Sequence, residues 1–306
     1  MCKITISTFE LFQMIPDQEA ARTYLENRLW PNGPRCPVCG TGDRVTPRKG
    51  GFYRCNPCKE DFTVRTGTVM ERSHIPLHKW VYAMYLVVTA RKGISSMQLS
   101  KEIGVTQKSA WFMLHRLREA AGDDTPAPLS GTVEIDETYV GGKEMNKHKS
   151  KKLNAGRGTV GKTAVFAMRE RGGKMIAGTV AVVNRQTVNG IISAHVDASA
   201  TINTDESLVY GGLRSAGYKH ETIHHGAGEY VRNDVTTNGV ESTFAVLKRG
   251  IVGVYHHISA KHLHRYVDEF SFRLNDGNVK RHTRDRLASF VDGAAGKRLT
   301  YKELKA

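Results

Sequence analysis

The sequence contains no apolar run that approaches the ~20 residues needed to span a bilayer. Its first residues, MCKITISTFELFQMIPDQEAA, also lack the basic region, the apolar core and the small-residue cleavage site of a secretory signal. These absences argue against a membrane protein and against a signal-directed secreted protein. We therefore expect a cytoplasmic protein without a membrane partner.

Acidic residues are scarce relative to basic ones. The chain has 30 Asp and Glu against 45 Lys and Arg, which gives a formal net charge of +15. Such an excess predicts an anionic partner, and no basic amphipathic helix indicates a membrane surface, so nucleic acid is the leading class. General RNA binding would produce the same charge. Charge therefore predicts the partner class and not the chemistry.

Cysteines are also few, and four of the five form two C-x2-C pairs with 15 residues between them. These four are Cys36, Cys39, Cys55 and Cys58. Two such pairs can place four thiolates tetrahedrally around one ion, so we expect structural Zn²⁺, with rubredoxin-like iron or disulfides as alternatives. A segment of ~35 residues is too small for a good core, so the metal would supply much of its folding energy. Cys2 is left over.

A Pro-rich polar linker, DDTPAPLSG, divides the chain. With 306 residues and 40% hydrophobic residues, the sequence is large and apolar enough for about two packed domains. The predicted segments are an N-terminal helix with the cysteine pairs at 8–70, a helical region at 71–122, the linker at 123–131, an α/β domain at 132–275 and a basic tail at 276–306.

The run GISSMQLSKEIGVTQKSAWFMLHRLREA has the pattern of a helix-turn-helix. Leu99 and Ile103 would face inward, and Gly104 would make the turn. The second helix of such a motif reads DNA in the major groove. The side chains left for DNA are Gln107, Lys108 and Arg116. The alternative is a helical hairpin with a charged solvent face.

The segment 132–275 predicts a mixed α/β layer, in the order three strands, helix, strand, helix, strand, helix. Its opening, TVEIDETYVGGK, alternates as a strand does, and TAVFAMRERGGKMIAGTVAVV predicts a hairpin that turns at Gly172 and Gly173. A lysine-rich loop lies between them at residues 143–162.

This loop ends in GRGTVGKT, which matches the letters of a phosphate-binding P-loop. A P-loop must open a helix, whereas this run leads into TAVFAMRE, a predicted strand, so nucleotide binding is not expected. We instead expect the basic loop to hold DNA phosphates, although a solvated loop would look the same. The residues expected at the phosphates are Lys149, Lys151, Lys152, Arg157 and Lys162.

Three acidic residues lie on separate predicted elements of the second half. Asp136 is in the strand VEIDETYV, Asp205 ends the strand TINTD, and Glu241 opens the last long helix, with 35 residues between Asp205 and Glu241. This order and spacing is typical of ribonuclease-H-like polynucleotidyl transferases, in which carboxylates from separate elements bind two Mg²⁺ ions ~3.5–4 Å apart. Lys248 lies two helical turns after Glu241 and therefore on the same helix face.

Each acid also has another interpretation. Rival carboxylates stand beside two of them, namely Glu134, Glu137 and Glu206. Asn238 could cap the helix and Glu241, three residues on, could complete a capping box. The order and spacing of the three acids together favour a metal site.

The chain resembles bacterial insertion-sequence transposases of the zinc-ribbon DDE type over nearly all of residues 8–275. The resemblance rests on long motifs, which are YLENRLWPNGPRCPVCG, FTVRTGTVMERSHIPLHKW, GISSMQLSKEIGV, VEIDETYVGGKE, NAGRGTVGKT, HHGAGEYVRNDVTTNGVES and LKRGIVGVYHHIS. It implies a ribonuclease-H-like mixed-sheet catalytic domain preceded by a zinc ribbon and a helix-turn-helix.

The resemblance also implies roles for single residues. Asp136, Asp205 and Glu241 would bind two catalytic Mg²⁺ or Mn²⁺ ions, and Lys248 would contact DNA. In some relatives an Asn replaces the helix Glu. The 35-residue spacing favours Glu241 as the ligand here, so Asn238 is expected to lie next to the metal ligands without binding the ions itself. The implied partners are the element's terminal inverted repeats and target DNA, bound by a dimer or larger assembly, with no small-molecule substrate and a location at the nucleoid.

Two other functions fit parts of the sequence. One is a non-catalytic zinc-ribbon DNA-binding regulator derived from a transposase, against which the intact acids argue. The other is a P-loop ATPase that works on DNA.

Overall fold

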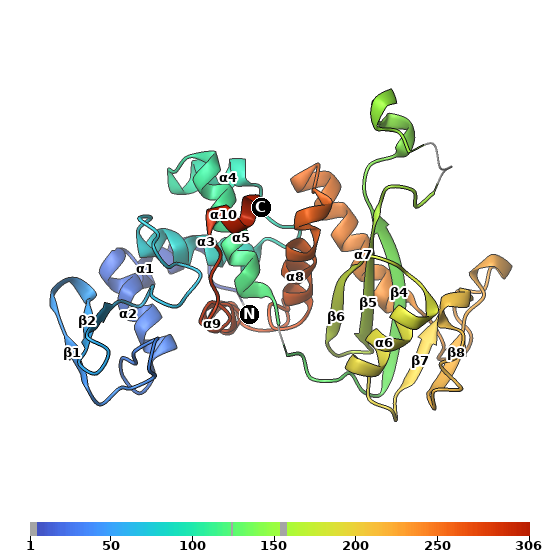
Figure 1. Cartoon of the computed structure of the whole chain (residues 1–306), viewed down its shortest axis with the longest axis horizontal. Coiled ribbons are helices and arrows are strands. Elements are labelled where there is room, and N and C mark those ends of the chain that lie inside the picture. The colour runs from blue at the N-terminus through green and yellow to red at the C-terminus, as the bar shows by residue number, and fades with distance from the viewer. Residues whose placement is uncertain (1–4, 124, 154–157) are drawn as a thin grey trace. The chain divides into compact units, whose positions relative to one another are not determined.

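The computed structural model describes residues 5–123, 125–153 and 158–306 (Figure 1). The predicted DNA-contacting residue Arg157 lies outside them. The chain divides into two compact units. One contains the residues up to Gly122 together with Asp276–Ala306, and the other contains Asp123–Asn275.

The first unit begins with two helices, α1 (Thr8–Met14) and α2 (Gln18–Leu29). The sequence predicted one helix over this range. Pro16 separates the two because proline has no amide hydrogen and cannot continue a helix. Asp17 starts α2, and its carboxylate accepts a hydrogen bond of 2.8 Å from the Ala20 amide. The chain then forms a small antiparallel sheet of β1 (Val45–Pro47), β2 (Tyr53–Cys55) and β3 (Glu60–Phe62).

The rest of this unit is helical. It contains α3 (Leu77–Thr89), α4 (Ser96–Ile103), α5 (Gln107–Ala121), α9 (Thr283–Asp292) and α10 (Tyr301–Lys305). Between α4 and α5, Gly104 adopts the left-handed conformation, with φ 61°, that a tight turn requires. Leu99 and Ile103 are buried, as the helix-turn-helix pattern predicted.

Residues 276–306 do not form a separate tail. Helix α9 packs against α2, α3 and α5. Its residues Phe290 and Val291 are completely buried, and Arg286 donates a hydrogen bond of 3.0 Å to the Val88 carbonyl. An apolar stripe within a basic segment therefore completes the core of the first unit.

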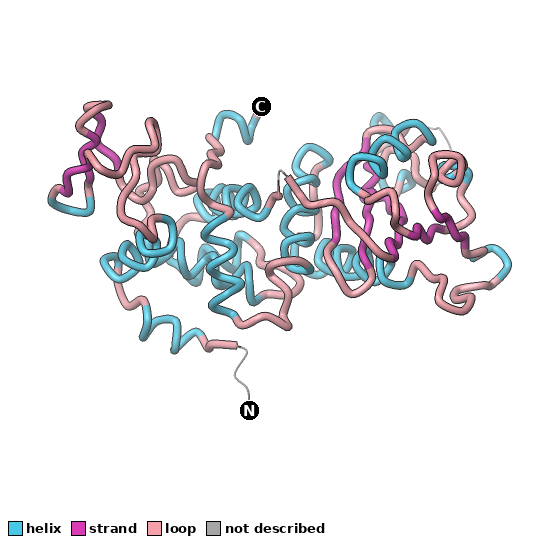
Figure 2. The backbone as a smooth tube through the Cα atoms, turned by 90° about the horizontal axis from the view of Figure 1, so that it is seen from below, coloured by secondary structure: helices cyan, strands magenta, loops and turns pink. Residues whose placement is uncertain are grey.

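The second unit is built on a five-stranded sheet in the order β6-β5-β4-β7-β8. Its strands are β4 (Thr132–Val140), β5 (Thr163–Glu170), β6 (Met175–Val180), β7 (Thr201–Thr204) and β8 (Lys219–Thr222). β4 pairs antiparallel with β5 and parallel with β7. Figure 2 shows these strands in magenta beside helices in cyan. The mixed sheet confirms the predicted fold class, and Gly172 turns the β5–β6 hairpin as expected.

Helices cover both faces of this sheet. Helix α6 (Arg185–His195) packs in one apolar core, which includes Val133 and Ile135 of β4. Helices α7 (Asn238–Gly250) and α8 (Leu263–Leu274) pack in the other, together with Ala167 of β5. Since side chains alternate along a strand, and Asp136 pairs with Ala167, the even-numbered acids of β4 lie on the face that α7 covers.

The predicted long helix after residue 238 is interrupted. A π-helical turn at Ile251–Tyr255 follows α7, and His256 has a φ of 57°, which ends the helical path before α8 begins. Throughout the described ranges, the helices are too short or too polar to cross a membrane.

Candidate active site and zinc centre

The four predicted zinc ligands lie together in the first unit. Their Sγ atoms all fall within 4.8 Å of one another, with 4.0 Å between Cys36 and Cys58 and 3.6 Å between Cys39 and Cys55. A tetrahedral Zn²⁺ with bonds of ~2.3 Å separates its sulfurs by roughly 3.8 Å, so these thiols fit that ion. All four are free cysteines, which rules out the disulfide alternative in this structure.

The sheet register brings two of the candidate acids side by side. In the parallel pairing of β4 with β7, Glu134 lies opposite Asn203. Continuing that register by two residues places Asp205, directly after β7, beside Asp136. Strands in a sheet lie about 4.8 Å apart, so a continued register would bring the two carboxylates to the same end of the sheet. Glu241 lies in the first turn of α7, near enough for its charge to act on both Asp136 and Asp205.

The electrostatics agree with this placement. Burial raises the pKa of Asp136 to about 7, and the charges of Glu137, Asp205 and Glu241 act in the same direction. Burial also raises the pKa of Asp205, with smaller contributions from Glu206 and Glu241 in the same direction. The site therefore concentrates negative charge in a partly buried place, which a bound cation would relieve.

The acids also supply suitable ligand atoms. Carboxylate oxygen is the ligand that Mg²⁺ and Mn²⁺ prefer. Among the described residues, the four cysteines are the only group of at least three potential ligands within 4.8 Å of one another, so the three acids are spread more widely. In a two-ion site the ions lie ~3.5–4 Å apart, so the carboxylates need not converge on one point. The donor atoms of these residues are therefore of the kind that such a pair of ions would take.

The rival acids are held by donors of the protein itself. Both Glu134 oxygens are occupied, one by the Val240 amide at 3.1 Å and the other by the Arg171 guanidinium at 3.1 Å. Glu137 accepts a hydrogen bond from the Tyr210 hydroxyl. Glu206 accepts two at 2.9 Å, from the amides of His225 and Gly226. Of these three, Glu134 is the one with both oxygens held by strong protein donors, which leaves it least able to bind a metal ion.

The predicted capping box at α7 is wrong. Thr237, not Asn238, precedes the helix, and its side chain makes no cap hydrogen bond. The Glu241 carboxylate instead accepts from the Thr237 hydroxyl at 2.8 Å. Because Glu134 accepts the Val240 amide, a residue far away in the sequence satisfies a helix-end donor that a local cap would otherwise take.

One side chain at the site was not anticipated. The Nε2 atom of His225 lies 3.3 Å from the nearer Glu241 oxygen and 3.2 Å from the Thr237 hydroxyl oxygen. It belongs to the motif HHGAGEY (residues 224–230), which precedes α7 in the sequence. Together with Thr237, His225 fixes the orientation of Glu241.

The predicted DNA-contacting residues differ in exposure. Gln107 and Lys108 are exposed at the start of α5, and Lys248 is exposed on α7. Arg116 is buried, and its guanidinium donates to the carbonyls of Glu71 at 2.9 Å and Leu299 at 3.0 Å. The prediction that Arg116 faces DNA is therefore wrong in this structure, because residues 276–306 cover that side of α5.

The lysine-rich loop presents several of the remaining candidates. Lys149 and Lys151 are exposed, whereas Lys152 and Lys162 are half-buried. The described part of GRGTVGKT, residues 158–163, leads into strand β5 and not into a helix. This confirms that the run is not a P-loop, because the helix N-terminus that would bind phosphate is missing there.

The raised pKa of Asp136 predicts a pH dependence. Its carboxyl has an ordinary pKa of 3.8 and a folded-state pKa of about 7. Between these values the folded state binds the extra proton, so without Mg²⁺ the free energy of unfolding should fall as pH rises from about 4 to 7. Urea unfolding of the zinc-loaded chain should show this fall, and Asp136→Asn should flatten it. An equally steep fall in the variant would contradict the assignment.

The mixed five-stranded sheet, with helices packed on both faces, has the arrangement of a ribonuclease-H-like fold. Comparison with known proteins agrees. Residues 128–275 match the ISXO2-like transposase domain, and residues 16–61 match the transposase zinc-ribbon domain. The chain is also 32% identical over 275 residues to an uncharacterized protein in transposable element ISH50 of Halobacterium salinarum, covering 85% of this chain and 91% of that protein.

The chain belongs to the ISXO2-like family of insertion-sequence transposases. Its zinc-ribbon and transposase domains imply that it binds DNA. The four-cysteine cluster, within the range of the zinc-ribbon match, supports a structural Zn²⁺ ion there.

Proposed function

We propose that the protein is a DNA transposase that binds the terminal inverted repeats of its element and catalyses Mg²⁺-dependent strand cleavage and strand transfer. The observation that supports this proposal is that Asp136, Asp205 and Glu241, from β4, the end of β7 and α7, are close enough for the charges of Asp205 and Glu241 to raise the pKa of Asp136. Two Mg²⁺ or Mn²⁺ ions bound by these acids would activate the attacking oxygen and stabilise the leaving one.

The reaction has two in-line steps. A water oxygen attacks a phosphorus at the element end, and the bond to the 3′ oxygen breaks to free a 3′-OH. That 3′-OH then loses its proton and attacks a phosphorus in target DNA, whose own 3′ oxygen leaves. Each step breaks one P–O bond and forms another, so the protein mainly has to position the reactants and stabilise charge.

The side chains around the acids perform this positioning. The Glu137 amide donates to Asp136 at 2.8 Å, and the Ser207 amide donates to Asp205 at 3.0 Å, which orients both carboxylates. Lys248 projects from the helix of Glu241 as an exposed side chain, and can hold a DNA phosphate beside the site. Asn238 is exposed in the first turn of the same helix, and we keep it as a supporting residue that does not itself bind the ions.

The first unit would recognise the element ends. The zinc ribbon and the helix-turn-helix, with Gln107 and Lys108, would bind the terminal repeats. Both ends must be joined in one event, so we expect a dimer or larger assembly on DNA at the nucleoid.

A cleavage assay tests the proposed function. Duplexes that contain the native element ends should be nicked at the element boundary in Mg²⁺ or Mn²⁺, and the products should join to a target plasmid. Ca²⁺ should support binding but not cleavage. Specific binding without any cleavage in Mg²⁺ or Mn²⁺ would instead favour the non-catalytic regulator.

The lysine-rich loop gives a separate prediction. Replacing Lys149, Lys151 and Lys152 with Ser should weaken DNA binding and reduce the slope of log K against log salt by about 0.9 for each phosphate that the loop no longer neutralises. Fluorescence anisotropy between low and moderate salt measures this slope. The matched control is Lys174→Ser, an exposed lysine in the β5–β6 turn, which should leave it unchanged. An unchanged slope in the triple variant would show that the loop is solvated and does not contact DNA phosphates.

A further inference from the structure

The buried carboxylate of Glu134 joins the two elements that carry Asp136 and Glu241. We propose that Glu134 is a positioning residue, which together with Gly239 holds α7 against β4 so that Glu241 faces Asp136. The proposal rests on the function proposed above, because it assumes that these acids form the metal site. It assigns a role to a carboxylate that stands two residues before Asp136 and binds no metal itself.

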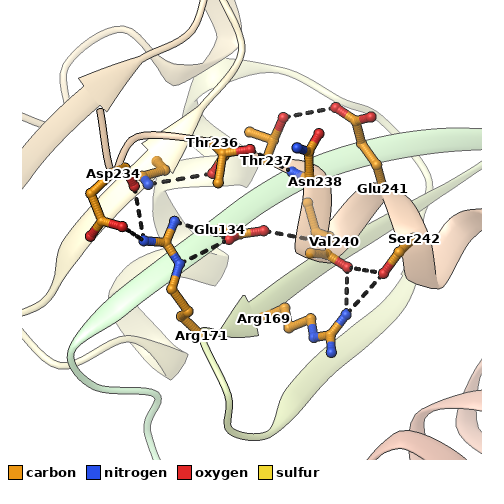
Figure 3. A network of polar contacts seen from close by, with 12 residues as sticks. Glu134, Arg169, Arg171, Asp234, Thr236, Thr237, Asn238, Val240, Glu241 and Ser242 are labelled. Carbon is orange, nitrogen blue, oxygen red and sulfur yellow. Dashed lines mark hydrogen bonds and ion pairs between the residues drawn. The ribbon is translucent and has the colours of Figure 1, made fainter. Parts of the chain in front are cut away.

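Glu134 makes contacts that only a close approach of helix and strand allows. Its side chain is buried, with only 3% of the residue exposed. One oxygen accepts the Val240 amide at 3.1 Å, and the other accepts two Arg171 nitrogens, Nη2 at 3.1 Å and Nε at 3.3 Å. Figure 3 shows the carboxylate between the helix end and the guanidinium. The Glu134 carboxylate thus receives charge-assisted hydrogen bonds from both sides.

Gly239 makes room for this carboxylate. A Cβ atom at position 239 would overlap one Glu134 oxygen and would lie only 3.0 Å from the carboxyl carbon. Gly239 has none of the positive φ values found elsewhere in the chain, so its conformation does not require glycine. The space required by Glu134 is therefore the reason that a side chain does not fit there.

Two arginines of the β5–β6 hairpin complete the attachment. Arg169 donates to the Gly239 carbonyl at 2.5 Å and to the Ser242 hydroxyl at 3.1 Å. Arg171 also binds the carbonyl and the carboxylate of Asp234, both at 2.8 Å, in the segment that leads into α7. The first turn of α7 is held at Gly239, Val240 and Ser242, and Glu241 lies within it (Figure 3).

The position of Glu134 makes this attachment relevant to the metal site. Glu134 and Asp136 lie on the same face of β4, two residues apart. Strand β4 therefore carries Asp136 and also, through Glu134, the contact that holds the start of α7, where Glu241 lies. A displacement of about 1 Å at a reacting group can lower the rate about a hundredfold. Small changes at the contact between Glu134 and α7 should therefore change the cleavage rate measurably.

Gly239→Ala tests the proposal without removing any charged group. The added methyl should displace the Glu134 carboxylate from the helix end. We expect kcat for end cleavage to fall about a hundredfold. Mn²⁺ binding to the DNA-free chain, measured by titration calorimetry, should weaken at least about tenfold, as is typical when support behind a metal ligand is lost. The affinity for element ends in EDTA-free, Mg²⁺-free buffer should stay the same.

The matched control is Gly190→Ala. Gly190 lies in helix α6 of the same unit, and apart from its chain neighbours and the backbone of its own helix nothing lies within 4 Å of the position of an added Cβ. This variant should cleave DNA and bind Mn²⁺ as the parent chain does. Thermal unfolding of both variants distinguishes loss of the fold from loss of position. A folded Gly239→Ala chain with parental Mn²⁺ affinity and kcat would overturn the proposal.

A second variant tests the pairing of the two residues directly. Shortening the acid with Glu134→Asp makes room for the methyl group, so Glu134→Asp/Gly239→Ala should recover Mn²⁺ affinity and kcat relative to Gly239→Ala alone. A double variant no better than Gly239→Ala would contradict the coupling between the two residues.

Asp136→Asn distinguishes a failure of the proposed function from a failure of the role proposed for Glu134. If it leaves Mn²⁺ binding and cleavage intact, the proposed function itself fails, whereas impaired binding and cleavage in Asp136→Asn beside parental behaviour in Gly239→Ala overturns only the role of Glu134.

Discussion

Asp205→Asn is expected to reduce cleavage and strand transfer on the order of a thousandfold. The substitution keeps the size of the side chain and removes the negative charge needed to hold a divalent ion. A metal ion contributes several kcal/mol of transition-state stabilisation, and each 1.36 kcal/mol is a factor of about ten in rate. The measurement is single-turnover cleavage of labelled element ends in Mg²⁺.

Asp197→Asn provides the matched control for this result. Asp197 is an exposed acid in the same unit, and its carboxylate accepts hydrogen bonds from Ser199 within its own turn. Its substitution should leave the cleavage rate within about twofold of the parent, as is usual for surface positions. Cleavage at the parental rate by Asp205→Asn would remove Asp205 from the active site, and Glu206 would become the acid to test.

The second large effect is expected at the zinc centre. Cys55→Ser should unfold the small sheet of β1, β2 and β3 and abolish specific binding to element ends. Structural Zn²⁺ binding is worth about 10–16 kcal/mol in zinc-finger peptides, far more than so small a segment gains from its apolar contacts. Its described core is Cys36, Cys55 and Phe62, with Trp30 and Tyr53 packed against them. Zinc content by atomic absorption and binding by anisotropy check this prediction.

Cys2→Ser is the control for the cysteine substitution. Cys2 is the fifth cysteine and belongs to neither C-x2-C pair. Its replacement should leave one zinc ion per chain and the affinity for element ends unchanged. A Cys55→Ser chain that still discriminates element ends from random DNA would show that the helices α4 and α5 suffice for recognition.

Sequence reasoning was most successful where the pattern was local. The two cysteine pairs, the left-handed glycine between α4 and α5, and the glycine turn of the β5–β6 hairpin are each marked by a short sequence signal. The wide spacing of Asp205 and Glu241 could be used only because it matches the arrangement of a known class of enzymes.

The predictions that failed depend on contacts between distant segments. Periodicity placed Arg116 on a polar face of α5, but it could not show that residues near Leu299 return to cover that face. The same holds for the cap of α7. Asn238 and Glu241 have the local spacing of a capping box, yet Glu134, more than a hundred residues earlier, binds the helix end. Long-range partners of this kind leave no periodic signal in the sequence.

The most direct test of the central claim is to locate the divalent ions. Crystals of the chain bound to its element end, grown in Mn²⁺ with Ca²⁺-free buffer and a substrate that cannot be cleaved, would give anomalous diffraction peaks at the metal positions. Two Mn²⁺ peaks about 3.5–4 Å apart, coordinated by Asp136, Asp205 and Glu241, are the predicted result. Two peaks coordinated by other residues, or no Mn²⁺ at these acids with DNA in place, would contradict it.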